Sequence, residues 1–178
     1  MFFLIVLIFF SVESSYCAED PAKFSTRPIT FICPLPPGST GDVSDRLISK
    51  TAEKFLGQPV VVVNKPGGGT TIGTAAIAAA KPDGYTVGYT ASGAMLIYPF
   101  VEQLPVFQNI VGPRGIPEEI VKKLEQAFTQ AIKEPSFIKG LKDLRFPVVY
   151  RNSKEMAEHI ADYYQFYGKI LKEMGLAK

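Results

Sequence analysis

The sequence is poor in the residues from which metal centres and catalytic triads are built. Its 178 residues include one histidine, two cysteines and no tryptophan. A structural zinc site needs a cluster of Cys and His ligands, so no metal is predicted. A Ser-His-Asp triad would require His159, which lies far along the chain from the loops described below, and no G-x-S-x-G nucleophile motif is present. We therefore expect His159 to lie at the surface or in packing, and we predict a protein that is not an enzyme and binds no cofactor.

The charge and the cysteines exclude two further classes of protein. There are 19 basic and 17 acidic residues, a net charge of +2, and no basic cluster carries interleaved aromatic residues. A nucleic-acid partner is therefore not expected. With two cysteines the chain has no disulfide framework. Cys33 lies within an apolar run and is predicted to be a small core residue.

The first 18 residues read as a signal peptide. Residues 2–10 form an uncharged apolar run of nine, too short to cross a bilayer as a helix and placed where a signal-peptide core belongs. Small residues follow, and cleavage after Cys17 or Ala18 would release an exported chain. No Lys or Arg precedes the run, and a buried strand is the alternative interpretation.

Two loops hold a large share of the glycines, at residues 36–42 and 66–71. Each follows a short apolar run and opens a segment of helical character. The unpaired N–H groups and the dipole of a helix N-terminus both favour an anion, so the two loops predict a pocket for a carboxylate or a phosphate. Neither loop fits the nucleotide P-loop or the dinucleotide fingerprint. Tight turns that bind no ligand are the alternative.

The order of elements predicts an α/β fold. Strands are expected at residues 28–33, 60–63, 85–90, 106–111 and 146–150, with helices at 42–56, 71–80, 117–133 and 152–174. The run of four valines at 60–63 is typical of a strand covered on both faces. A β-α-β-α-β start implies parallel strands with right-handed crossovers. We predict a single lobe with a mainly parallel five-stranded sheet, helices on both faces, and a ligand beyond the carboxyl ends of the strands.

Three expectations concern residues within the helices. Asp45 and Arg46 are expected to be solvated or paired on the helix at 42–56. Asn152 is expected to cap the last helix, with Glu155 reaching back. The apolar residues expected to point inward on that helix are Met156, Ile160, Tyr163, Tyr167, Ile170 and Met174.

The loops and their surroundings resemble a known family. A strand that ends in P-L-P-P-G, an L-G-Q-P-V-V-V-V-N segment, a K-P-G-G-G loop and a P-D-G-Y-T strand follow in order. This combination resembles the Bug-type, periplasmic solute-binding receptors of tripartite tricarboxylate transporters. The residues that match the family pattern are Pro36, Pro37, Gly38, Asp42, Gly57, Gln58, Pro59, Asn64, Pro66, Gly67, Pro82, Asp83, Gly84, Tyr85 and Thr86.

The resemblance implies a domain at residues 27–178 equivalent to lobe one of a type II periplasmic binding protein. Family members have two lobes, and most of the second is missing here through an apparent internal deletion near residues 100–107. It further implies a monomeric periplasmic receptor that binds a small organic acid and presents it to the membrane permease subunits of the transporter. With one wall of the pocket absent, we expect weak, roughly millimolar binding.

The resemblance also implies how the ligand is held. Backbone amides at residues 38–40 and 68–70 are the expected donors, assisted by hydroxyls, while Asp42 is expected to order the first loop. The candidate contacts are Gly38, Ser39, Thr40, Asp42, Gly67, Gly68, Gly69, Thr70 and Ser92. Two alternatives remain: an α/β enzyme with Asp42 as base, and an interaction module without a ligand that pairs with a full-length receptor or with itself.

Overall fold

A four-stranded sheet forms the centre of the molecule. The computed structural model describes residues 23–91, 108–144 and 150–173. Within them the strands are β1 (Ile29–Cys33), β2 (Val60–Asn64), β3 (Thr86–Ala91) and β4 (Gln108–Val111), in the spatial order β2-β1-β3-β4. The first three strands are parallel, and β4 runs antiparallel to β3. The parallel part confirms the β-α-β-α-β start expected from the sequence.

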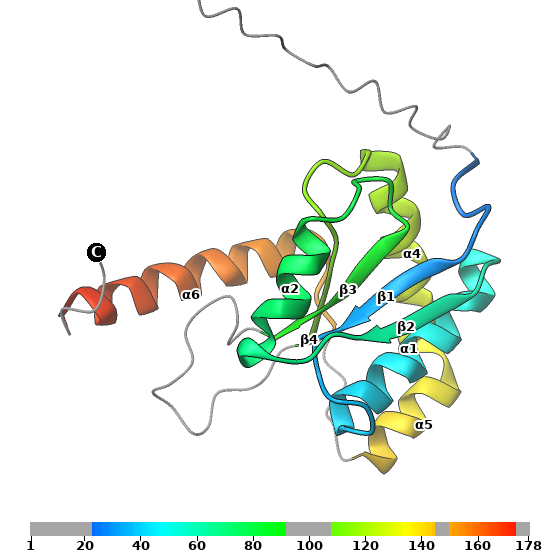
Figure 1. Ribbon diagram of the computed structural model, residues 1–178, viewed down its shortest axis with the longest axis horizontal. Coiled ribbons are helices and arrows are strands. Elements are labelled where there is room, and N and C mark those ends of the chain that lie inside the picture. The colour runs from blue at the N-terminus through cyan, green and yellow to red at the C-terminus, as the bar shows by residue number, and fades with distance from the viewer. Residues whose placement is uncertain (1–22, 92–107, 145–149, 174–178) are drawn as a thin grey trace, which may run out of the picture.

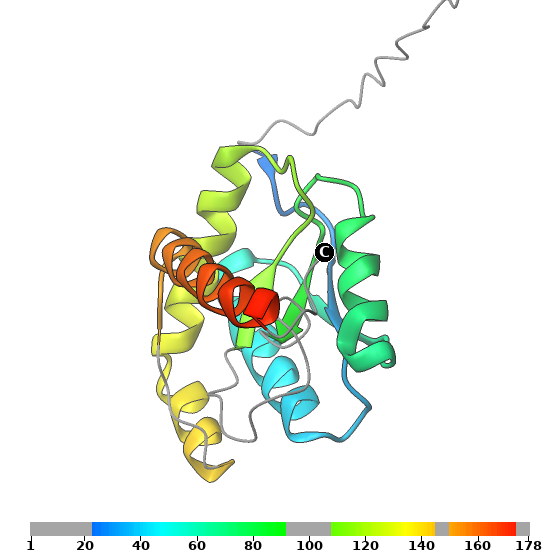
Figure 2. The ribbon, with the colours of Figure 1, turned by 90° about the vertical axis from the view of Figure 1, so that its left-hand side faces the viewer.

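Helices cover both faces of this sheet, as Figures 1 and 2 show. Helices α1 (Thr40–Leu56), α4 (Glu118–Lys133) and α5 (Pro135–Asp143) lie on one face. The short helix α2 (Thr71–Ala78), preceded by the 3-10 turn η2 (Gly68–Thr70), lies on the other. The predicted α/β class with helices on both faces is confirmed.

The main core lies between the sheet and the layer formed by α1 and α4. Phe31 and Ile29 of β1 are fully buried there, and the Phe31 ring meets the edge of Phe128 from α4 at a centroid distance of 6.3 Å. Apolar residues of α4 recur on one helical face, which the structure buries. This burial fixes α1 against the sheet and so fixes the direction in which its N-terminus points.

Two expectations about the sheet concern the valine run at 60–63 and the strand at 146–150. The valine run at 60–63 was expected to be covered on both faces, which is wrong: Val61 and Val63 are 50% and 38% exposed. Since β2 is an edge strand and α2 packs over β1 and β3, the side chains on this face of β2 stay open to solvent. The expected fifth strand at 146–150 falls outside the described residues except for Tyr150, which belongs to no strand.

The ends of the helices follow the sequence closely. Gly57 ends α1 in the left-handed conformation, with φ of 67°, and its N–H donates to the carbonyl of Glu53 at 2.9 Å. At the start of α6 (Ser153–Glu173), Asn152 and Glu155 exchange the expected pair of hydrogen bonds, at 3.1 and 2.9 Å. The helix α5 has no counterpart among the expected elements.

Helix α6 projects away from the sheet and its covering helices (Figures 1 and 2). The apolar face expected to point inward rests largely on side chains outside the described set; Met156 is half-buried. The proposed signal peptide at residues 1–18 also lies outside the described residues. None of the helices that are described is long and apolar enough to span a membrane.

A close approach of α2 to the first loop supplies the first testable prediction. A Cβ added at Gly73 would lie 2.6 Å from Pro34 Cβ, 2.9 Å from Pro34 Cα and 3.0 Å from the Lys65 carbonyl oxygen. Alanine normally favours a helix by about 1 kcal/mol over glycine, but here it meets backbone that cannot yield. We expect Gly73→Ala to lower the free energy of unfolding by about 1 to 2 kcal/mol in urea titrations.

The matched control is Gly140→Ala in α5, where the added Cβ meets only the end of the Leu47 side chain. A flexible side chain can move aside, so this variant is expected to lose less stability than Gly73→Ala. A Gly73→Ala protein as stable as the wild type would contradict the close packing of α2 against Pro34.

Candidate functional site

The first glycine loop leads from β1 into a capped helix. Gly38 adopts a left-handed φ of 79°, and Ser39 is the N-cap of α1 with extended backbone. The Ser39 hydroxyl accepts a hydrogen bond from the N–H of Asp42 at 3.3 Å, and its carbonyl accepts from Val43 at 3.0 Å. Helix α1 therefore begins at Thr40, two residues earlier than the sequence indicated.

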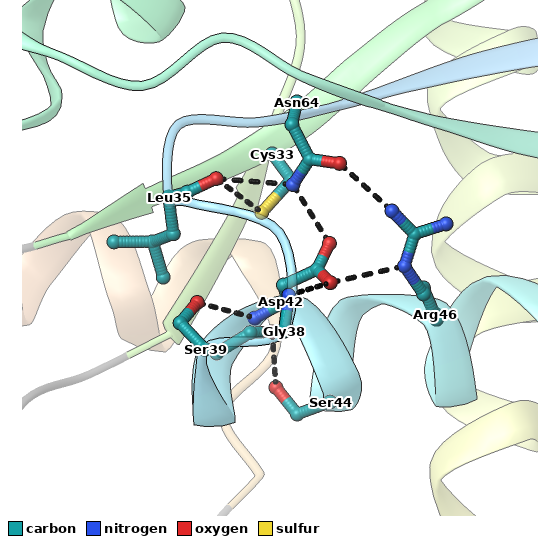
Figure 3. A network of polar contacts seen from close by, with 9 residues as sticks. Cys33, Leu35, Gly38, Ser39, Asp42, Ser44, Arg46 and Asn64 are labelled. Atoms are coloured by element: carbon teal, nitrogen blue, oxygen red, sulfur yellow. Dashed lines mark hydrogen bonds and ion pairs between the residues drawn. The ribbon is translucent and has the colours of Figure 1, made fainter.

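Asp42 is the centre of the polar network drawn in Figure 3. Its carboxylate, only 2% exposed, accepts hydrogen bonds from the Gly38 N–H at 2.9 Å, Arg46 Nε at 3.0 Å and Asn64 Nδ2 at 2.7 Å. The amide of Asn64 also donates to the Leu35 carbonyl at 3.0 Å, and its oxygen accepts from Arg46 at 2.7 Å. Asp42 thus ties the loop, the helix and the end of β2 together.

The protonation state of Asp42 follows from these partners. Burial alone would raise the pKa of Asp42, but the hydrogen bonds from Arg46, Asn64 and Gly38 together hold it below its usual value. The carboxylate is therefore ionised at neutral pH, and both of its oxygens already accept hydrogen bonds. Such a group stabilises the loop and is poorly suited to act as a general base.

Hydrogen bonds within the loop decide which of its amides stay available to a ligand. The N–H of Gly38 donates to Asp42, and the N–H of Ser39 donates to the Pro36 carbonyl at 3.2 Å. The amides of Thr40 and Gly41, in the first turn of α1, have no acceptor among the described residues. The donors of the first loop are thus shifted along the chain from the expected 38–40 to 40–41.

The second loop has an unusual backbone. Gly67, Gly68, Gly69 and Thr70 all have positive φ, at 123°, 56°, 60° and 78°. A β-branched residue such as Thr70 rarely adopts this conformation, and such strain often accompanies a binding site. The loop is closed by the Thr70 N–H, which donates to the Gly67 carbonyl at 3.0 Å.

The amides of Gly68 and Gly69 have no acceptor among the described residues, whereas that of Thr70 is already used within the loop. The Thr70 hydroxyl oxygen is buried and has no hydrogen-bond partner among the described residues. Two amides of the expected set therefore remain available in the second loop.

Both loops lie at the same end of the sheet, as Figure 1 shows. They follow the carboxyl ends of the parallel neighbours β1 and β2, and the Lys65 N–H donates to the Cys33 carbonyl at 2.8 Å between them. Ser92, the remaining expected contact, lies outside the described residues. Gly38 and Gly67 to Gly69 are exposed to solvent, so the site is open rather than enclosed.

Asp45 is a residue that the sequence interpretation misjudged. It was expected to be solvated or paired on α1, yet it is 3% exposed and its Oδ2 has no hydrogen-bond partner among the described residues. It lies against the buried thiol of Cys33. Its position follows the buried stripe of α1 formed by Gly41, Ile48 and Ala52, and that helical spacing was the available signal.

Burial governs the titration of this cluster. It raises the pKa of Asp45 to about 7 and that of the Cys33 thiol to about 12. The pKa of Tyr89, on the neighbouring strand β3, is also raised, first by burial and then by the charge of Asp45. Near neutral pH, Asp45 is therefore divided between its protonated and ionised forms.

A groove of about 480 Å³ lies elsewhere on the surface, between α1 and α5. Its lining residues are Val43, Arg46, Leu47, Lys50, Gly140, Asp143 and Leu144. It opens on the outer side of α1, away from the second loop, and includes none of the candidate contacts.

Comparisons with known proteins agree with this arrangement. The model of the "Tripartite tricarboxylate transporter family receptor" family matches residues 45–109 and again residues 102–176. The fold and the loops define a lobe of a solute-binding receptor. The chain belongs to the tripartite tricarboxylate transporter receptor family, as the resemblance of its motifs implied.

One relative is the protein BugT of Bordetella pertussis, 39% identical over 92 residues, which are 52% of this chain and 28% of BugT. The chain thus matches under a third of that relative's length. The periplasmic binding protein BugD superposes with a TM-score of 0.75 at 14% identity, over 86% of this chain and 99% of BugD. MatC of Rhodopseudomonas palustris, solved with bound malate, gives 0.69 at 16% identity, over 83% and 100%. At these identities the two structures establish the fold alone.

The Asp42 network yields a second prediction. Asp42→Asn removes the charge and cannot accept all three hydrogen bonds, so we expect the free energy of unfolding at pH 7 to fall by about 2 to 3 kcal/mol. Because the folded-state pKa of Asp42 is lowered, its contribution is present above about pH 4 and is lost as the pH falls through that lowered value. Urea titrations from pH 7 down to pH 3 should show the two proteins converging.

Glu118→Gln is the control, because it breaks an ion pair of the same i,i+4 spacing with Lys122 on the surface of α4. No measurable loss is expected there. An Asp42→Asn loss no larger than that of the control would contradict the role of Asp42 in holding the loop.

Asp45 yields a third prediction with the opposite sign. Its folded-state pKa of about 7 lies above the ordinary 3.8, so the folded state holds the proton more tightly and stability falls as the pH rises from about 4 through 7. Asp45→Asn does not titrate. The free energy of unfolding of the variant minus that of the wild type should therefore increase by up to about 4 kcal/mol between pH 4 and pH 8, whatever its value at pH 4. A constant difference across that range in urea titrations would overturn this assignment.

Proposed function

We propose that this chain is a receptor for a small carboxylate, which it binds at the two glycine loops. The observation that carries the proposal is the set of amides that have no acceptor among the described residues, at the exposed Thr40, Gly68 and Gly69 and at the buried Gly41. They stand at the N-terminal ends of α1 and of η2 leading into α2, at one end of the sheet. Helix dipoles and unpaired N–H groups at such ends favour an anion.

The charges around the first loop are compatible with an anion there. Asp42 would repel a carboxylate, but it is paired with Arg46 and accepts three hydrogen bonds. The ligand would then be held by neutral amides rather than by a free cation. Malate in the related MatC structure supports a small dicarboxylate as the ligand class. The expected contacts Gly38, Ser39, Asp42 and Gly67 remain part of the proposal as residues that shape the loops, and Ser92 remains in it as a hydroxyl that assists ligand binding.

A single open lobe would bind its ligand weakly. Ligand pockets normally bury most of the ligand's surface, and hinge closure supplies the second wall in two-lobed receptors. The two stretches that match the family model meet at residues 102–109, which supports an internal deletion near residues 100–107. With half of the contacts, a dissociation constant of roughly millimolar size is the expected result.

The cellular setting follows from the family. We propose that residues 1–18 direct export, that the receptor acts as a monomer in the periplasm, and that it presents its ligand to the membrane permease of a tripartite tricarboxylate transporter. The periplasmic location of BugD supports this setting. An enzyme with Asp42 as base is disfavoured, because that carboxylate is fully engaged and its pKa is lowered.

A pair of variants at Thr40 tests the role of the amides. Thr40 is the first residue of α1, where proline fits, and the extended backbone of Ser39 (ψ 157°) suits a residue before proline. Thr40→Pro removes the N–H together with the hydroxyl, while Thr40→Ala removes the hydroxyl and the γ-methyl group but keeps the N–H. We expect Thr40→Pro to weaken malate binding by about tenfold or more, and Thr40→Ala to weaken it much less.

The measurement is an NMR titration of the wild type and both variants with a panel of carboxylates that includes malate, since shifts report weak binding. Equal losses in the two variants would exclude the Thr40 amide as a donor. No saturable shift in the wild type with any acid would defeat the receptor function and favour an interaction module without a ligand.

A further inference from the structure

Asp45 lies on α1 one helical turn after the first-loop amides of the proposed anion site. It follows Gly41 by four residues, and both belong to the buried stripe of α1. In a helix, residues four apart share a face, and side chains lean towards the N-terminus. This geometry favours a carboxyl near the first turn of α1, whose amides at Thr40 and Gly41 have no acceptor among the described residues. At 1.5 Å of rise per residue, about 6 Å separates the two levels along the helix axis.

Among the described residues no cation forms an ion pair with Asp45, although the charge of Arg46, the next residue on the helix, acts to lower its pKa. Its neighbours on the sheet are the thiol of Cys33 on β1 and the phenol of Tyr89 on β3, both neutral at physiological pH because burial raises their pKa values. On its own helix, Asp42 is negative, and Arg46 is committed to Asp42 and Asn64. The Oδ2 atom of Asp45 has no hydrogen-bond partner among the described residues.

The other elements packed against α1 supply no partner of opposite charge to Asp45. Helix α4 presents apolar residues such as Leu124 and Phe128 to the shared core. The end of β2 contributes the neutral amide of Asn64. On α5, Asp143 lies across the outer groove beside Arg46 and Lys50. The Lys54–Glu134 ion pair lies more than two turns further along α1.

We propose that Asp45 couples anion binding at the first loop to a proton: the site takes up a carboxylate together with a proton on Asp45, and it releases the carboxylate when that proton is lost. This inference rests on the proposed function of the loops. It adds a residue that determines affinity without touching the ligand.

The physical reason is repulsion between like charges in a site with little screening. An ionised Asp45 and a ligand carboxylate would lie on opposite sides of one helical turn, with the buried side at low dielectric. By linkage, if ionisation weakens ligand binding, then ligand binding must raise the affinity of Asp45 for its proton by the same factor. Burial raises the pKa of Asp45 to about 7, which places the effect near neutral pH.

The test is the dissociation constant of malate between pH 6 and pH 8.5, where its carboxyl groups are ionised like those of Asp and Glu side chains. For the wild type we expect the affinity to fall by about tenfold across this range, equivalent to a shift of one unit in the pKa of Asp45 on binding. Asp45→Asn, neutral and of the same shape, should show no such fall. Asp143→Asn removes an exposed carboxylate of α5, across the outer groove from α1. Its affinity for malate should fall with pH as that of the wild type does.

A second measurement follows the proton directly. Calorimetry of the wild type at pH 7.5 in buffers of different ionisation enthalpy should show net proton uptake on malate binding, and Asp45→Asn should show none. If Asp45→Asn does not fold, as judged by circular dichroism, Asp45→Ser takes its place.

The outcomes separate the two proposals. Malate binding that falls with pH equally in wild type and Asp45→Asn, or that takes up no proton, would overturn the role of Asp45 while leaving the receptor function intact. No binding of malate or of any other acid in the carboxylate panel, at any pH and in any of these proteins, would overturn both. A pH dependence that is present in the wild type and in Asp143→Asn but lost in Asp45→Asn supports both proposals.

Discussion

The structure of the site depends on the carboxylate of Asp42. It is buried at the start of α1, and its hydrogen bonds join the Gly38 amide, Arg46 and Asn64. A buried charge is stable only when its partners satisfy it, so this network holds the loop, the helix and the end of β2 in one arrangement. The arrangement also uses up the Gly38 amide, which moves the available donors to Thr40 and Gly41.

The remaining architecture places those donors. Burial of Phe31 and Phe128 fixes α1 and α4 against the sheet, and the close contact of Gly73 with Pro34 brings α2 up to the first loop. Because β1 and β2 are parallel neighbours, the two loops that follow them emerge at the same edge. The result is a pair of solvent-exposed loops at one edge of the sheet, where we propose that an anion binds.

Much of this organisation could be predicted from local pattern. The β-α-β-α-β order of elements, the stop at Gly57 and the cap at Asn152 all rest on patterns of residues close in the chain. The two glycine loops were found for the same reason, since glycine marks positions of positive φ. Val61 was predicted to be covered and is exposed, while Asp45 was predicted to be solvated or paired and is buried. Both predictions were wrong because burial depends on which element packs over a given face.

The sequence by itself determined the class of the protein: its family, its α/β order and the two glycine loops. These are properties of short sequence segments and of the order in which the segments follow one another. Only the tertiary structure decided which amides are available and which acid is buried beneath them. Hydrogen bonds such as Asn64 to Asp42, and contacts such as Asp45 to Cys33, join residues far apart in the chain. No local pattern encodes such pairings, because they arise only when the helix packs against the sheet.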